Sequence, residues 1–265
     1  MSNKLYLSNS SIKTFLKCKQ KFKFKHIDKI DTGKKTESKY MSFGNSMHAA
    51  LADYNNITNP QYKTLKNLHN LLRKNWIREG YETIEEEKSY GEMGLNMLTQ
   101  YYNDRKDKEI ENYIIEDMVF KNMKDYVLCG KLDKVYLRED KKVEVLDYKT
   151  GKTSGLIDKI QLPIYLILTK EKLNYYPDII SIYYLKSNKK LNKALNKDTI
   201  KKATESILKL CEVIKNEKNY DASPNAYCKK YCEYFDICEA AKNKNQNIIN
   251  ELDQLEKEDK LKTVF

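Results

Sequence analysis

Two aspartates in one predicted β-hairpin are the residues best suited to chemistry. The stretch CGKLDKVYLREDKKVEVLDYKTGK, residues 129–152, has the composition of two strands around a turn near Asp140. Positions equidistant from the turn of an antiparallel hairpin face each other. Asp133 and Asp147 each stand seven residues from Asp140, so we expect them to lie opposite one another on one face. Lys149 is two residues beyond Asp147 and should share that face.

Two carboxylates at this spacing, about 4.5–5.5 Å between their Cβ atoms, are costly unless a cation neutralises them. Mg²⁺ suits such a place, because it takes oxygen ligands from one or two carboxylates and keeps several waters. Lys149 could then position or activate an attacking water, or stabilise a pentavalent phosphate. The alternative is a solvated hairpin end that carries a cross-strand cluster of charges.

The hairpin and three further motifs resemble the PD-(D/E)xK nucleases, specifically their RecB-like exonuclease branch. Gly130-x-x-Asp133 followed by DYKTG at 147–151 resembles the active-site signature. GNSMH at 44–48 resembles the Gly-x-x-x-His helix motif, and QLPIY at 161–165 resembles the Gln-x-x-x-Tyr helix motif. The opening SNSSIKTFLKC at 8–18 resembles the Ser-rich, Cys-containing first helix. Together the motifs span residues 8–238 in the order that the family has them.

This resemblance implies a metal site. Asp133 and Asp147 would bind Mg²⁺ or Mn²⁺, with His48 as an additional ligand and the carbonyl of Tyr148 completing the site. The family often has a glutamate in the strand before the first aspartate, and Glu116 is the nearest candidate. A lone histidine such as His48 has the alternative of being a hydrogen-bonded core residue.

The resemblance also implies catalytic roles for Lys149, Gln161 and Tyr165. Lys149 would assist the water. Gln161 and Tyr165 are i and i+4, so they stack on one face of an otherwise apolar helix and would orient the DNA. The alternative for this pair is the polar boundary of an amphipathic helix. Pro163 is compatible with a helix that begins just before it.

Three of the six cysteines stand close together late in the chain, as Cys228-x₃-Cys232-x₅-Cys238. Three soft ligands need a fourth to complete a cluster or a tetrahedral metal site. Cys18, Cys129 and Cys211 are the candidates for the fourth ligand. Cys129 falls in a predicted strand and Cys211 on an apolar helix face, so both are expected to be core residues.

The resemblance implies that Cys18 joins the three late cysteines around a 4Fe–4S cluster. Cys18 stands where iron–sulfur members of the branch carry a lone early ligand. These members include the Cas4-type CRISPR-adaptation nucleases and the AddB-type helicase–nuclease subunits. The family usually has two residues between the first two late cysteines, and this chain has three. Zinc and an absence of metal remain open alternatives.

Helical periodicity comes before strand periodicity along the chain. We expect a first helix capped by Ser8 or Ser10, with Phe15, Cys18 and Phe22 on one face. Further helices are expected at 43–56, 61–79, 85–106, 157–170 and 199–217, and strands at 112–121, 125–137, 142–149 and 179–186. The resemblance implies an α/β fold with a restriction-endonuclease-like core, a central mixed sheet flanked by helices. An N-terminal helical region and a C-terminal cysteine cluster complete it.

We expect a single nuclease domain over residues 1–240, with a helical insertion at about 57–110 and iron–sulfur elements at 18 and 228–238. Residues 241–265 are expected to form a C-terminal helical tail. The chain has no apolar run of membrane-spanning length and no signal-peptide core, which predicts a cytoplasmic protein.

The net charge of +11 points to a polyanionic partner, which we expect to be DNA. Residues 1–39 carry a net +8 and residues 186–209 a net +6, so their lysines could track phosphates. A lysine-rich composition that reflects an A/T-rich genome is the alternative. The chain has no Walker A motif, so any helicase motor or CRISPR-adaptation integrase would be another chain.

The sequence thus predicts a metal-dependent DNA exonuclease that acts on single strands or DNA ends in repair, recombination or CRISPR spacer processing. One alternative is a non-catalytic DNA-binding or assembly subunit. Another is a metal-sensing regulator that uses the cysteines, which would leave the carboxylate strand unexplained.

Overall fold

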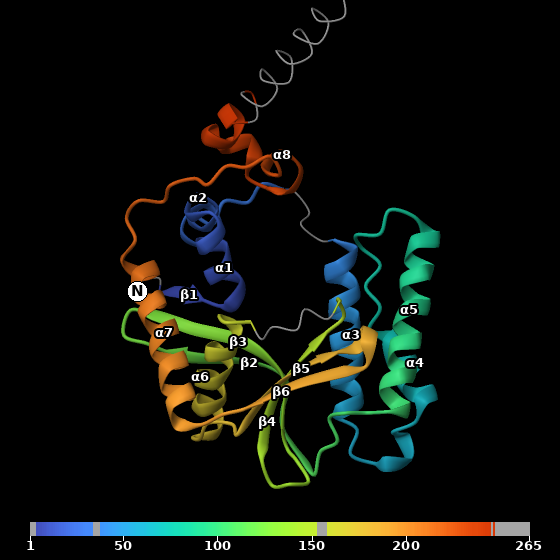
Figure 1. The fold of residues 1–265 in the computed structure, drawn as a ribbon. Helices are drawn as coiled ribbons and strands as arrows, with labels where there is room; N and C mark the ends of the chain where they lie inside the picture. Colours follow the sequence, from blue (N-terminus) through green and yellow to red (C-terminus); the bar gives the residue numbers. More distant parts are fainter. Residues whose placement is uncertain (1–3, 34–37, 153–157, 245, 247–265) are drawn as a thin grey trace, which may run out of the picture. The chain divides into compact units, whose positions relative to one another are not determined.

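The computed structural model describes residues 4–33, 38–152, 158–244 and 246 (Figure 1). The chain forms two compact units. We call Met1–Thr36 with Cys211–Phe265 the cysteine unit, and Glu37–Leu210 the sheet unit. Of the tail expected at 241–265, residues 241–244 are helical, and residues 245 and 247–265 lie outside the described part.

The sheet unit contains a mixed β-sheet. Its strands are β2 (Glu111–Asn122), β3 (Tyr126–Leu137), β4 (Val143–Lys149), β5 (Ile179–Tyr184) and β6 (Lys189–Ala194). Within this unit they lie in the order β2-β3-β4-β5-β6, with β4 parallel to β5 and the other neighbours antiparallel. The expected α/β class and mixed sheet flanked by helices are therefore confirmed.

Parallel strands need a crossover connection, and helix α6 (Gln161–Leu173) provides it between β4 and β5. This helix was expected over 157–170; residue 157 lies outside the described residues, and the helix begins at Gln161. Asp158 Oδ1 accepts the backbone N–H groups of Ile160 and Gln161 at 2.9 and 3.2 Å, which places the first turn here. Pro163 therefore lies in the first turn, where its missing N–H costs no helical hydrogen bond. Asn174 ends the helix in a left-handed conformation, φ 65°.

A helical layer packs on the sheet and consists of α3 (Lys39–Asn55), α4 (Leu65–Lys74) and α5 (Ile84–Asn103), with the short turn η2 (Pro60–Tyr62) between α3 and α4. Ser38, Thr64 and Thr83 cap the three helices through their side-chain oxygens. Because Ser38 supplies the cap, α3 begins four residues before the expected Phe43. Likewise α4 ends at Lys74 and not at residue 79.

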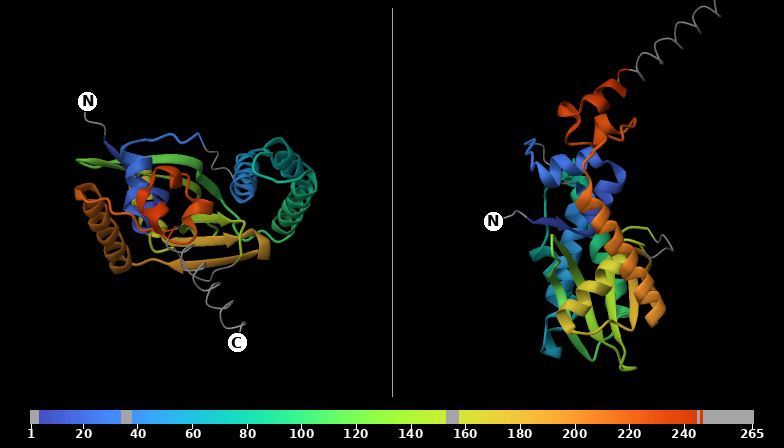
Figure 2. Two further views of the ribbon diagram at one scale, coloured as in Figure 1. Left: turned by 90° about the horizontal axis from the view of Figure 1, so that it is seen from above. Right: turned by 90° about the vertical axis from the view of Figure 1, so that its left-hand side faces the viewer.

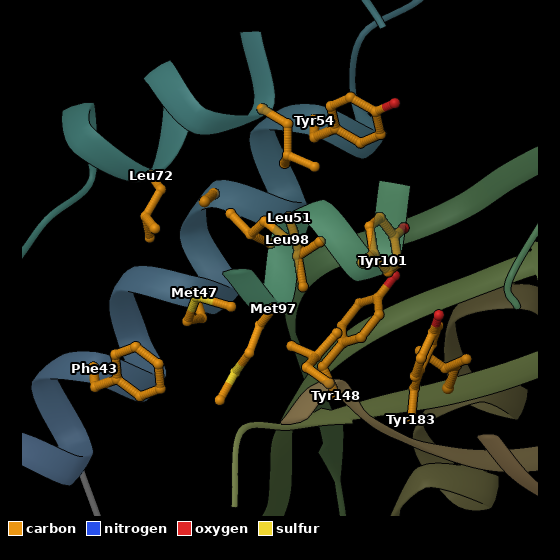
Figure 3. Packing of buried hydrophobic residues seen from close by; sticks show 14 of the residues in the cluster. Phe43, Met47, Leu51, Tyr54, Leu72, Met97, Leu98, Tyr101, Tyr148 and Tyr183 are labelled. Carbon is orange, nitrogen blue, oxygen red and sulfur yellow. The ribbon is translucent and has the colours of Figure 1, made fainter. Parts of the chain in front are cut away.

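The core of the sheet unit lies between these helices and the sheet (Figure 3). Three tyrosine rings meet there, Tyr101 of α5, Tyr148 of β4 and Tyr183 of β5, with centroids 5.6–6.2 Å apart. Successive residues of a strand point to opposite faces. Tyr148 therefore enters the helical layer, while its neighbour Asp147 points to the other face and bonds to Gln161 and Tyr165 of α6. The ribbon shows α6 on the opposite side of the sheet from α3 (Figures 1 and 2).

Strand β6 is a strand that the sequence did not predict. Its sequence KKLNKA is polar and mostly exposed, so neither apolar alternation nor β-branched residues indicate a strand. It pairs with β5 along the edge, where lysines are common because they discourage pairing with other chains. The turn η3 (Leu185–Ser187) before it ends β5 two residues earlier than expected.

The cysteine unit joins the two ends of the chain. Its early part holds β1 (Leu5–Leu7), α1 (Asn9–Lys17), α2 (Lys19–Phe22) and the π-helical turn η1 (Lys23–Ile27). Its late part holds α8 (Cys228–Tyr231) and η4 (Phe235–Ile237), and the boundary between the units falls within α7 (Lys197–Asn216). None of the helices in the described residues is long and apolar enough to cross a membrane.

The first helix does not continue through Cys18, contrary to the expected single face of Phe15, Cys18 and Phe22. Cys18 is extended, φ −162°, and separates α1 from α2. Ser8 caps α1 with Ser11 in a capping box, as one of the two expected caps. The break directs the Cys18 sulfur toward the late segment, where it accepts the backbone N–H of Ser223 at 3.5 Å.

Candidate active site and cysteine cavity

The two hairpin aspartates lie at the point where strands β3 and β4 separate. The ladder between the strands runs from Leu137↔Val143 to Lys134↔Leu146 and stops there. One position further on, the backbone N–H of Tyr148 donates to Asp133 Oδ2 at 2.8 Å. Asp133 and Asp147 are 6% and 5% exposed. The hairpin thus brings two buried carboxylates together at the open end of a ladder.

Three donor atoms form a group that could hold a metal ion. Among the described residues, the ligand atoms of His48, Glu116 and Asp133 lie within 4.8 Å of one another. His48 Nδ1 is 2.9 Å from Glu116 Oε1 and 3.4 Å from Asp133 Oδ2. The sequence had marked His48 and Asp133 as ligands and Glu116 only as the nearest candidate, and the structure places all three together.

Glu116 reaches this group through an unusual backbone conformation. Its φ is 49°, in the left-handed region that non-glycine residues seldom adopt. The pairs Ile115↔Lys134 and Asp117↔Leu132 lie on either side, so Glu116 is level with Asp133 in the register. Backbone strain of this kind gathers at functional sites, where the surrounding structure enforces it.

Asp147 is surrounded by the other three residues that the sequence marked as catalytic. Gln161 Nε2 donates to its Oδ1 at 2.6 Å, and the Tyr165 hydroxyl donates to the same oxygen at 3.0 Å. Lys149 Nζ lies 2.7 Å from Oδ2. Gln161 and Tyr165 also bond to each other at 2.9 Å, as their i, i+4 spacing allows. The structure therefore brings all four side chains together.

The electrostatics of the site oppose ionisation of Asp147. Burial, followed by the neighbouring charge of Asp133, raises the pKa of Asp147 to about 6 despite the ammonium of Lys149. Burial alone would lower the pKa of His48, but Asp133 and Glu116 raise it to about 10. In the metal-free protein the His48 imidazolium therefore stands beside the carboxylates as their counter-charge.

These residues fit a hard divalent cation. Oδ2 of Asp147 and Oε2 of Glu116 are buried atoms that accept no hydrogen bond of good geometry, although a lysine lies near each. Buried carboxylate oxygens with free lone pairs suit Mg²⁺ or Mn²⁺, and one imidazole is compatible with them. The predicted role of the Tyr148 carbonyl stays a prediction, because the observed contacts of Tyr148 involve its N–H and its side chain.

Lys131 is a site residue that the sequence reasoning missed. Its ammonium pairs with Glu116 Oε2, while its side chain is 55% exposed. It is two residues before Asp133, the same spacing that singled out Lys149 beside Asp147. This spacing was the signal that could have found it.

The four predicted cluster ligands line one cavity in the cysteine unit. Cys18, Cys228, Cys232 and Cys238 border a cavity of about 310 Å³, and all four are free thiols that are half-buried. Backbone N–H groups point at two of the sulfurs. Asn225 donates to Cys228 Sγ at 3.3 Å, and Cys18 Sγ accepts from residues of both chain segments at 3.5 Å. The other two cysteines, Cys129 and Cys211, are buried as expected.

Several early lysines of this unit are engaged in ion pairs and are therefore less available to bind DNA phosphates. Lys19 pairs with Glu217, and Lys21 and Lys25 both pair with Glu233 of the late segment. Part of the basic charge at residues 1–39 thus joins the two chain segments, and it is not all free to track phosphates.

One comparison with known proteins, a match to a family, agrees with this geometry. A sequence model of the PD-(D/E)XK nuclease superfamily matches residues 6–239. None of the curated proteins matches the chain. Solved structures that match include a protein of Eubacterium rectale named "putative exonuclease", at 12% identity and a TM-score of 0.48, covering 91% of this chain and 89% of that one. Another is the protein SSO0001, at 15% identity and a TM-score of 0.40, with the same coverage.

Proposed function

The chain belongs to the PD-(D/E)XK nuclease superfamily, which implies a metal-dependent nuclease, and from this we propose that it is a DNA exonuclease. The substrate would be single-stranded DNA or DNA ends, in repair, recombination or CRISPR spacer processing. The observation that carries the proposal is the setting of Asp147. This buried carboxylate is held by Lys149, Gln161 and Tyr165 beside a group of three further donors.

We assign the metal site to His48, Glu116, Asp133 and Asp147, with Mg²⁺ or Mn²⁺ as the cation. A bound cation would lower the pKa of a water and screen the phosphate, which is the difficult part of phosphodiester hydrolysis. Asp147 must be ionised to act as a ligand, and its pKa of about 6 leaves it ionised at neutral pH.

Lys149 acts in this proposal as a fixed positive charge. Burial alone would lower its pKa, but the charges of Asp147 and Asp133 outweigh burial and raise it above the usual value. The side chain therefore stays an ammonium at neutral pH and cannot accept a proton from water. It can donate hydrogen bonds to an attacking water or to a non-bridging phosphate oxygen as charge develops there.

Gln161 and Tyr165 hold Asp147 in one orientation. Both donate to Oδ1, which leaves Oδ2, the oxygen beside Lys149, as the one that would bind a cation. The phenol of Tyr165 stays protonated, since burial raises its pKa well above the usual value, so it remains a donor. Gln161 and Tyr165 can orient Asp147 without DNA present. That they also orient the DNA backbone stays part of the proposal.

We propose a 4Fe–4S cluster as the occupant of the cysteine cavity. Four thiolates on one zinc ion, each about 2.3 Å from it, would lie within about 4 Å of one another. Among the described residues, the group gathered within 4.8 Å is His48, Glu116 and Asp133, which contains no thiol. Cysteines spread around about 310 Å³ favour a larger group, and N–H donors to sulfur are typical of iron–sulfur sites.

DNA is the proposed partner of both units. The cysteine unit carries a net +6 and the sheet unit a net +5, so neither accounts alone for the +11 of the chain. A helicase or a CRISPR-adaptation integrase on another chain remains a possible assembly partner within this proposal. A cytoplasmic location also stays a prediction.

Digestion of end-labelled single-stranded DNA with Mn²⁺ tests the enzymatic proposal. The wild type should release labelled mononucleotides or short products, and Asp147→Ala should be inactive. Asp140→Ala is the matched control, since Asp140 is an exposed carboxylate at the turn of the same hairpin. If Asp147→Ala cleaves as fast as the wild type, the enzymatic proposal fails and a non-catalytic DNA-binding subunit becomes the better account.

A further inference from the structure

A buried ion pair lies directly behind the candidate metal site. Lys134 and Asp107 are both 0% exposed, and Lys134 Nζ is 2.9 Å from Asp107 Oδ2. Lys134 follows Asp133 on β3, so its side chain points to the opposite face of the strand. Lys134 Nζ also donates to the carbonyl of Asp107 at 2.9 Å and to Asn55 Oδ1 at 3.0 Å. The lysine is thus saturated with acceptors inside the core.

The same carboxylate also holds strand β4. The hydroxyl of Tyr148 donates to Asp107 Oδ2, and Asn55 Nδ2 donates to that hydroxyl at 3.3 Å. Tyr148 stands between Asp147 and Lys149 in the sequence and is 2% exposed. One oxygen of Asp107 therefore binds a residue from each of the two strands that carry the catalytic aspartates (Figure 3 shows the Tyr148 ring among its neighbours).

This connection lies at the end of the ladder between the two strands. The pairing of β3 with β4 ends at Lys134↔Leu146, just before Asp133 and Asp147. Beyond that point, β4 is held on its other side by β5, through Tyr148↔Tyr183 and its neighbours. The Lys134–Asp107–Tyr148 connection is thus a tie between β3 and β4 that bridges the open end from behind.

The tie belongs to a network of buried charged groups. Arg105 donates to Asp107 Oδ1 at 3.0 Å, and Glu109 accepts from Lys134 at 3.1 Å, so two cations face two carboxylates. Burial alone would raise the pKa of Asp107, but Lys134 and Arg105 lower it below its usual value and keep it ionised. Buried ion pairs seldom stabilise a protein more than apolar side chains of the same volume would. Its presence behind the site therefore suggests a geometric purpose.

We propose that the Asp107–Lys134 pair is a positioning device for the metal site. By holding Lys134 of β3 and Tyr148 of β4 on one carboxylate, it sets the separation of Asp133 and Asp147, and with it the affinity for the divalent cation. The side chains of Asp107, Lys134 and Tyr148 are positioning groups, because they bond to one another on the face of the strands opposite the candidate metal ligands. The predicted Tyr148 ligand is its backbone carbonyl, which Tyr148→Phe leaves in place. This inference rests on the metal site of the proposed function.

The test is direct binding of Mn²⁺, followed by electron paramagnetic resonance on the intact protein. Tyr148→Phe removes one hydroxyl and keeps the ring in the core. Residues that orient metal ligands typically account for about 10–100-fold in affinity, so we expect a loss of this size. Tyr183→Phe is the matched control, since its hydroxyl bonds to Asn188 Oδ1 at 2.7 Å in the same core without touching Asp107.

Thermal unfolding without metal separates positioning from stability. Both variants should lower Tm by a similar amount, while only Tyr148→Phe should weaken Mn²⁺ binding. Asp107→Asn provides a second variant and should weaken binding at least as much. Equal Mn²⁺ affinity in Tyr148→Phe and Tyr183→Phe would overturn the proposal, and so would a wild type that binds no Mn²⁺. A wild type that binds Mn²⁺ without cleaving DNA would end the proposed function and leave the positioning test intact.

Discussion

Metal binding at this site should be coupled to the loss of a proton from His48. A pKa of about 10 means that the imidazole is protonated at neutral pH in the metal-free protein. A histidine must be neutral to ligate a metal, so binding must release that proton. The site thus exchanges an imidazolium for a divalent cation within the same group of carboxylates.

This exchange predicts how Mn²⁺ affinity depends on pH. Between pH 6.5 and 8.5 the association constant should rise about tenfold per pH unit, because one proton leaves His48. Below pH 6 the slope should approach two, since Asp147 must also ionise. Titration calorimetry in buffers of different ionisation enthalpy measures both slope and proton release. His48→Gln should remove the dependence above pH 6.5, and a flat wild-type profile in that range would show that metal binding displaces no proton from His48.

A second prediction concerns the stability of the metal-free protein. The pKa of Asp147 is raised by folding, so its contribution to stability is complete below about pH 4 and is lost as pH rises through about 6. At pH 7.5, Asp147→Asn should therefore stabilise the metal-free protein, by about 1–3 kcal/mol, while it abolishes cleavage. Denaturant unfolding at pH 4 and 7.5 measures the difference. Asp140→Asn serves as the control, and a destabilised Asp147→Asn at pH 7.5 would contradict the prediction.

Single residues were predictable where strand arithmetic applies. The nearness of Asp133 to Asp147 follows from their equal distance to the turn, although the ladder ends one pair before them. The position of Lys149 follows from alternation. The arrival of Glu116 depends on a left-handed φ, which no sequence rule assigns to a glutamate. The Lys134–Asp107 pair could not be predicted from the sequence either. Its residues are 27 positions apart, and charged residues are normally expected at the surface.

At the scale of elements, the long periodic segments were predictable and the polar or broken ones were not. Strands β2, β3 and β4 begin and end within one residue of the expected ranges, since apolar residues mark them clearly. The lysine-rich edge strand β6 has no such mark. The break at Cys18 was hidden as well, because Phe15 and Phe22 continue the helical spacing across it, and tertiary contacts of the sulfur decide the conformation.

The short helix α8 leads to a prediction about single-stranded DNA. Tyr227 precedes the helix and Tyr231 ends it, and the two residues are 70% and 65% exposed. Their ring centroids are 6.2 Å apart, and Lys230 Nζ is 5.2 Å from the Tyr231 centroid. Exposed aromatic rings beside lysines are a common platform for stacked bases. Either change, Tyr227→Ala or Tyr231→Ala, should weaken binding of an oligo-dT strand by about 1–3 kcal/mol.

Fluorescence anisotropy in EDTA measures this binding without cleavage. Tyr62→Ala is the matched control, since Tyr62 is 62% exposed in η2 of the sheet unit. Losses of affinity no larger than that of Tyr62→Ala would show that α8 does not contact the strand.

At the scale of the whole molecule, the chain ends are joined in one unit while the residues between them form the other. Within the cysteine unit the backbone N–H of Gln20 bonds to the carbonyl of Asp221 at 3.3 Å, and Lys21 pairs with Glu233. A group held by Cys18 and Cys228 would close a loop of about 210 residues. Closure entropy grows only slowly with loop length, so one such tie constrains the whole chain at little more cost than a short loop.

The cysteine tie gives the last prediction, on Cys232→Ala. If four thiolates hold an iron–sulfur cluster, the variant should lose the brown chromophore of anaerobically purified protein. A cross-link over so long a loop contributes about 4–5 kcal/mol, which corresponds to a fall in Tm of about 10 °C or more. Cys129→Ala is the matched control, because it truncates a buried cysteine of β3 outside the cavity. It should lose stability but keep its colour.

Metal analysis of the same preparations separates the candidate occupants. About four irons per chain in the wild type and Cys129→Ala, and few in Cys232→Ala, would match the cluster. One zinc per colourless chain would replace it by a single tetrahedral ion, which requires the thiols to move together from their places around about 310 Å³. In either case the tie remains. Wild-type protein without metal and with the Tm of Cys232→Ala would show instead that ion pairs such as Lys21–Glu233 hold the unit alone.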